Sequence, residues 1–148
     1  MSLFDDSAEN QRPLGITLLA ALYLFFLLVS ASTFGNPFPF CGRILTGMSA
    51  QLLVLVDSLL CLYLFLGVLQ RQAFTWYLLL AYNLLQMVNT IVNLYLIPMA
   101  ELEVVTGGQV SRDALWTNNM IAVLGMLLLT QYIFRQRRLF TDNCRYLF

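Results

Sequence analysis

The stretch that decides the fold is Phe74–Ile97, which reads FTWYLLLAYNLLQMVNTIVNLYLI and contains no charged residue. About 20 mostly apolar residues in a helix cross the roughly 30 Å hydrocarbon layer of a bilayer, because each residue adds about 1.5 Å. Backbone polar groups in lipid must be paired within their own segment, and a helix pairs them. The stretch is therefore predicted to be a transmembrane helix.

Three further stretches pass the same test of length and apolar composition. They are Leu14–Phe34, Gly47–Leu69 and Leu115–Phe134. Only Gly47–Leu69 contains a charged residue, Asp57. We predict an all-α membrane protein in which residues 1–148 form one domain, a four-helix transmembrane bundle with antiparallel up-down topology.

The overall composition fits a bilayer better than water. Apolar residues make up 59% of the chain and charged residues only 11%, whereas soluble domains carry about 25% charged residues. The eight positive charges are all arginines, they balance eight acidic residues, and there is no histidine. No basic block exists to bind nucleic acid, and the commonest general base and metal ligand is missing.

Local sequence signals support these boundaries. Pro13 precedes the first apolar run, where a proline suits the start of a helix. The polar residues 70–72 predict a tight turn, so the second and third spans should pack as an antiparallel hairpin. Pro98 ends the third span, and Ser111 is placed to cap the fourth.

The arginines predict the orientation in the membrane. With four spans, the two termini and the 70–73 turn share one side, and positive residues favour the cytoplasmic side. That side carries six arginines and the other side carries two. The six are Arg12, Arg71, Arg135, Arg137, Arg138 and Arg145, and the two are Arg43 and Arg112. Both termini are therefore predicted to be cytoplasmic. The cluster Arg135, Arg137 and Arg138 is interpreted as a topogenic anchor in preference to a specific site for anionic lipid.

The third span carries a polar face. At about 100° per residue, its polar side chains project into an arc of roughly 120°. The members are Tyr82, Asn83, Gln86, Asn89, Thr90 and Asn93. Unpaired amides in hydrocarbon are costly, so this face should turn away from lipid.

The second span offers a matching polar face with Gln51, Asp57 and Ser58. Asp57 lies near the middle of the span, where an ionised aspartate costs about 2.5–3.5 kcal/mol on insertion scales. No arginine, lysine or histidine lies in any span to neutralise it. Asp57 is expected either to stay protonated and donate to an amide oxygen, or to face water or a bound cation. The first span is polar only at its outer end, which predicts a peripheral, lipid-facing helix.

Two functions fit these polar faces. In the favoured interpretation they are interhelical contacts of a non-enzymatic oligomerising or accessory subunit, which meets a second copy or a partner membrane subunit. The fourth span adds a small-residue stripe, Asn118, Ala122 and Gly125, suited to close helix packing. The alternative is a proton, cation or small-solute transporter or channel that uses Asp57 and the polar face of the third span. Catalytic motifs are lacking, so no enzyme activity, cofactor or metal is predicted.

The opening of the first span is similar to a known pattern. Residues 12–20, RPLGITLLA, resemble the start of many small prokaryotic multi-span membrane proteins, in which a basic residue and a proline lead directly into the first helix. The resemblance implies a protein of a prokaryotic cytoplasmic (inner) membrane. It implies no particular function.

Overall fold

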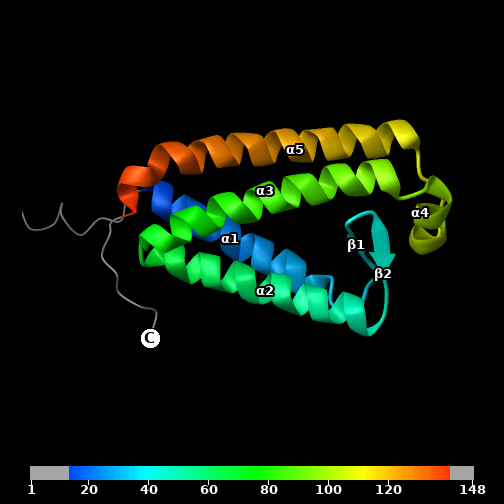
Figure 1. Cartoon of the computed structure of the whole chain (residues 1–148), viewed down its shortest axis with the longest axis horizontal. Coiled ribbons are helices and arrows are strands. Elements are labelled where there is room, and N and C mark those ends of the chain that lie inside the picture. The colour runs from blue at the N-terminus through cyan, green and yellow to red at the C-terminus, as the bar shows by residue number, and fades with distance from the viewer. Residues whose placement is uncertain (1–13, 141–148) are drawn as a thin grey trace, which may run out of the picture.

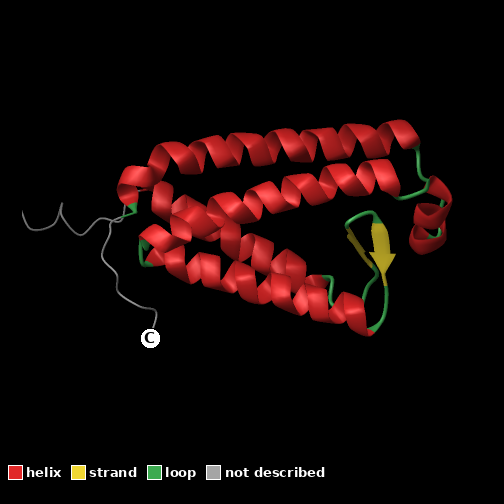
Figure 2. Ribbon diagram, in the orientation of Figure 1, coloured by secondary structure: helices red, strands yellow, loops and turns green. Residues whose placement is uncertain are grey.

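The computed structural model describes residues 14–140 and is mostly helical. Arg12, Pro13 and Arg145, on which some predictions rest, lie outside the described residues. The elements follow in the order α1 (Leu14–Ser32), β1 (Phe38–Phe40), β2 (Arg43–Leu45), α2 (Met48–Leu69), α3 (Ala73–Leu96), α4 (Met99–Thr106), α5 (Arg112–Arg135) and the 3₁₀ helix η1 (Gln136–Leu139). Figure 1 shows their arrangement and Figure 2 separates helices, strands and loops.

Four of these helices are long enough and apolar enough to cross a membrane. They are α1, α2, α3 and α5 continued through η1, so the four predicted spans are confirmed to within a few residues. The third helix ends at Leu96, before Pro98, as predicted. Ser111 stands at the first position before α5, but its side chain makes no capping hydrogen bond.

The helices pack as two pairs. The most extensive contacts join α1 to α2 and α3 to α5, while α2 and α3 touch over a smaller area. The second and third spans are joined directly by the short turn that the sequence predicted, but they touch each other less than the two members of either pair do. Figure 1 shows the two pairs close together at the end that carries η1 and apart at the end that carries the strands. We call these the η1 end and the hairpin end.

The core lies between the pairs toward the η1 end. Its fully buried side chains come mainly from α1, α2 and α3 and include Tyr23, Leu64 and Leu79. The first helix buries five residues, whereas α5 buries only Ile133 among its own. The prediction of a peripheral first span is thus wrong, and α5 is the least covered of the four. The position of α1 was mispredicted because its apolar residues surround the whole helix and do not indicate which face is buried.

Two small elements lie at the hairpin end. Residues 38–45 form an antiparallel β-hairpin in which Phe40 pairs with Arg43, leaving Cys41 and Gly42 as the turn. Both turn residues have positive φ, 48° and 79°, which is the backbone of a type I′ turn. This hairpin departs from the all-α prediction. The other element is α4, in the connection between α3 and α5.

Candidate functional site

Three side chains from two other helices donate hydrogen bonds to the carboxylate of Asp57. Ser30 Oγ of α1 donates to Oδ2 at 2.7 Å, and Tyr82 Oη and Gln86 Nε2 of α3 donate to Oδ1 at 3.0 and 3.2 Å. Asp57 itself is half-buried near the middle of α2. Hydrogen bonds to a carboxylate are stronger than those between neutral groups, so this site joins the end of α1 to the middle of α2 and α3.

A second layer of groups continues this network. Ser58 Oγ donates to Ser30 Oγ at 3.1 Å, and Cys61 Sγ lies 3.2 Å from Tyr82 Oη. Because the Tyr82 hydroxyl hydrogen points to Asp57, the thiol is the donor in the Cys61 contact. Each chain of donors therefore ends at Asp57, which makes the carboxylate the common acceptor of the cluster.

A pocket with a volume of about 140 Å³ opens beside Asp57. It lies between α2 and α3 and is lined mainly by apolar side chains, with Asp57, Gln86 and Asn89 as its polar members. Phe38 and Phe40 of β1 line it from the hairpin. Figure 1 shows the hairpin lying between the two helix pairs where they separate.

The residues of the predicted polar face of α3 have different hydrogen-bond partners. Asp57, Ser58 and Gln86 are brought together, as the matching faces suggested. Thr90 bonds instead to the backbone oxygen of Gln86 in its own helix at 2.8 Å. Gln51, on α2, is half-buried and is not part of the Asp57 network.

Asn89 and Asn93 hold the hairpin. Asn89 Oδ1 accepts from the Cys41 backbone N–H at 2.9 Å, and Asn93 Oδ1 accepts from that of Gly42 at 2.7 Å. Asn93 Nδ2 donates to the backbone oxygen of Pro39 at 3.1 Å. A Cβ on Gly42 would lie 2.6 Å from Leu96 Cβ, so glycine permits both the turn and the close approach to α3.

Asn83 is buried on the side of α3 that faces α1. Its Oδ1 accepts from Tyr23 Oη at 3.1 Å, and its Nδ2 has no hydrogen-bond partner in the described part of the chain. Tyr23 was not among the predicted site residues, nor was Ser30, because α1 was expected to face lipid. Their one signal was shared spacing, since residues seven apart lie on the same helix face.

The charges around Asp57 are sparse. Between residues 14 and 140, the arginines lie only at the ends of the long helices or outside them, away from the middle of α2. No three His, Cys, Asp or Glu side chains of this part of the chain come together to hold a metal ion. A divalent ion such as Ca²⁺ takes six or more oxygen ligands, which this site does not assemble. The site around Asp57 therefore consists of one carboxylate, neutral hydrogen-bond donors and a mainly apolar pocket.

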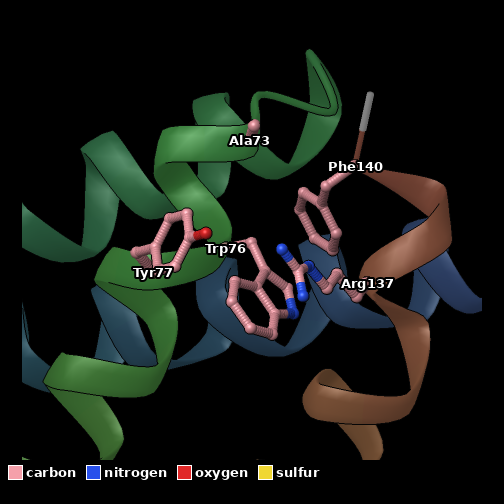
Figure 3. Close-up of a pocket in the computed structure, with 5 residues that line it drawn as sticks. All are labelled: Ala73, Trp76, Tyr77, Arg137 and Phe140. Carbon is pink, nitrogen blue, oxygen red and sulfur yellow. The ribbon is translucent and has the colours of Figure 1, made fainter. Parts of the chain in front are cut away.

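A second cluster lies at the η1 end. Trp76 Nε1 donates to the backbone oxygen of Ile133 at 3.0 Å, and the Arg137 guanidinium stands 5.2 Å from the Trp76 ring centroid. Figure 3 shows these side chains with Tyr77 and Phe140 beside them. This cluster ties α3 to the end of α5, and it includes one of the three arginines that were predicted to anchor the chain.

The fold defines a class of protein, a mostly helical chain with four helices long and apolar enough to span a membrane. Comparison of the chain with protein-family models, curated proteins and solved structures finds no match. The geometry around Asp57 is therefore the basis for the function proposed below.

Proposed function

We propose that this chain is a carrier or channel for protons, a monovalent cation or a small solute, with Asp57 as its binding group. The observation that carries the proposal is the 140 Å³ pocket that exposes one carboxylate at mid-helix depth between two helix pairs. An ionisable side chain inside a membrane is expensive and commonly marks a solute path. Here four antiparallel up-down spans cross a prokaryotic inner membrane, with both termini cytoplasmic.

The hydrogen bonds of Asp57 give the site a means of response. A cation or proton bound to the carboxylate competes with the donors from Ser30, Tyr82 and Gln86. Loss of the bonds from Tyr82 and Gln86 weakens the link between the α1/α2 pair and α3, and the pairs are already separated on the hairpin side. Binding at Asp57 thereby shifts the spacing between the pairs, which is what an alternating site requires.

The test replaces Asp57 with asparagine in purified protein reconstituted into liposomes. Asparagine keeps an oxygen to accept from Tyr82 and Gln86, so the fold is retained. Proton entry is measured with an internal pH dye and cation entry with radioactive sodium. We expect flux above that of empty liposomes for the natural chain, flux at the empty level for Asp57→Asn, and no change for the control Asp113→Asn. Equal flux in all samples would exclude the proposal.

A second candidate function is that of an oligomerising or accessory subunit without enzyme activity. It is favoured by the outer surface of α5, where Asn118, Ala122 and Gly125 are all exposed and a Cβ on Gly125 would touch nothing within 4 Å. An amide facing lipid gains a hydrogen bond when a second helix covers it, and small residues let that helix approach.

This candidate is tested by native mass spectrometry in mild detergent. A dimer or larger assembly that dissociates in Asn118→Leu and Gly125→Leu would support it. The control is Met120→Leu, which lies on the opposite side of α5 at about 100° per residue. A monomer at all concentrations, with no co-purifying membrane partner, would remove this candidate.

A further inference from the structure

The η1 end of the molecule concentrates positive charge. Within residues 14–140 it holds Arg71 in the α2–α3 turn, Arg135 at the end of α5, and Arg137 and Arg138 in η1. The acidic residues of the same part of the chain lie elsewhere, with Asp57 at mid-helix and the others on α4 and at the start of α5. No carboxylate is therefore at hand, among the described residues, to neutralise these arginines.

Arg137 differs from the other arginines in its aromatic surroundings. Its guanidinium faces the Trp76 ring at 5.2 Å, a distance at which the ring attracts a cation. The indole is held in turn by its bond to Ile133 and by Tyr77, whose ring meets it edge-on at 4.8 Å between centroids. One cationic group is thus fixed in place at this end, and stacking on a ring leaves the N–H edge of a guanidinium free to donate.

A small pocket adjoins this guanidinium. Its volume is about 40 Å³, and Ala73, Trp76, Tyr77, Arg137 and Phe140 line it (Figure 3). A water needs about 10–15 Å³ by this measure, so the pocket admits about three or four groups of that size, such as the oxygens of a phosphate. It is too small for a whole lipid headgroup or a nucleotide.

The position of the pocket identifies the source of the anion. It lies where two membrane-spanning helices end, and tryptophan and tyrosine at such ends lie at the level of lipid headgroups. Arginine presents a planar pair of donors that matches a phosphate. We propose that Arg137, stacked on Trp76, binds the phosphate of an anionic phospholipid such as phosphatidylglycerol, as a specific site in addition to the general attraction of the arginine cluster.

The first test compares two charge-conserving substitutions. Arg137→Lys keeps the charge but loses the planar donor pair. Arg138→Lys makes the same change at the neighbouring arginine, which is equally classed as exposed but for which the structure gives no aromatic contact. Native mass spectrometry from mixed micelles measures retention of phosphatidylglycerol relative to phosphatidylcholine. We expect Arg137→Lys to lose roughly tenfold in this ratio, as for one charged hydrogen bond, and Arg138→Lys to keep it. Equal ratios in both variants would overturn the proposal.

The second test keeps Arg137 and reads the site directly. The chain has two tryptophans, so Trp116→Phe leaves Trp76 as its single emitter. In vesicles we expect phosphatidylglycerol with brominated chains to quench Trp76 more strongly than brominated phosphatidylcholine does. Replacing chloride with inorganic phosphate at equal ionic strength should leave this preference unchanged. Equal quenching by the two lipids, or loss of the preference in phosphate, would overturn the lipid site.

Discussion

The two ends of this helix bundle are held together by different kinds of contact. At the η1 end the helices meet closely, with Gly67 so near Thr75 that a Cβ on the glycine would overlap the threonine side chain. At the hairpin end the helix pairs separate, and side-chain hydrogen bonds from Asn89 and Asn93 hold a β-hairpin in the space between them. Close packing leaves little freedom, whereas a few polar bonds across an open region leave room for a solute and for motion.

The largest effect expected from this contrast follows substitution at Gly67. Gly67→Leu places a side chain where Thr75 already lies, so α2 and α3 must separate at the turn that joins them. Overpacking of this kind costs about 1–3 kcal/mol or more. Thermal unfolding followed by circular dichroism in detergent should show a clear fall in Tm.

The control for this substitution is Ala81→Leu, which adds bulk at an exposed position of α3. We expect its Tm to stay close to that of the natural chain. If Gly67→Leu were equally harmless, the η1 end would not be the rigid end of the bundle, and the contrast between the two ends would fail.

A smaller effect is expected at the hairpin end. Asn93→Leu removes two hydrogen bonds to the hairpin, each worth about 0.6–2 kcal/mol between membrane helices. The helices should remain folded while the hairpin detaches, because no core residue depends on Asn93. Limited trypsin digestion in detergent should then cut faster after Arg43, which lies in β2.

Arg112, at the start of α5, supplies an internal control in the same digest because it is far from the hairpin in sequence and exposed. Its cleavage rate should not change. Faster cutting after both arginines would mean that Asn93 stabilises the whole bundle, and the local role assigned to it would be wrong.

The four spans were predictable from sequence because length and apolar composition are properties of single segments. The polar residues of α2 and α3 were also found, since their periodicity marks one face of each helix. Their hydrogen-bond partners were not predicted. Asn89 and Asn93 were grouped with Asp57 by the face they share, but both form hydrogen bonds with the hairpin, and only Asn89 also lines the pocket beside Asp57.

The hairpin and the role of α1 were missed for separate physical reasons. Phe38–Leu45 is short, contains a proline and resembles an interfacial loop, and only Gly42 at the second turn position hints at a type I′ turn. Tyr23 has only apolar neighbours three or four positions away, and Ser30 belongs to the polar outer end of the first span. Which helix α1 contacts depends on packing between segments, which periodicity within one segment does not encode.

The smallest expected effect distinguishes two serines of the Asp57 network. Ser30→Ala removes the donor to Asp57 Oδ2 and the acceptor for Ser58, whereas Ser58→Ala removes only an outer donor. Interhelical hydrogen bonds average about 0.6 kcal/mol in membranes, so Ser30→Ala should lower the free energy of unfolding by roughly that amount and Ser58→Ala by less.

The decisive measurement for these serines is a double-mutant cycle in which Ser30→Ala is made in the natural chain and in Asp57→Leu. If the serine acts through the carboxylate, its effect on Tm should nearly vanish once Asp57 is gone, because leucine accepts no hydrogen bond. An effect of unchanged size in both backgrounds would mean that Ser30 matters only for helix packing. The polar link between α1 and α2 would then be incidental, and the hairpin end would depend on Asn89 and Asn93 alone.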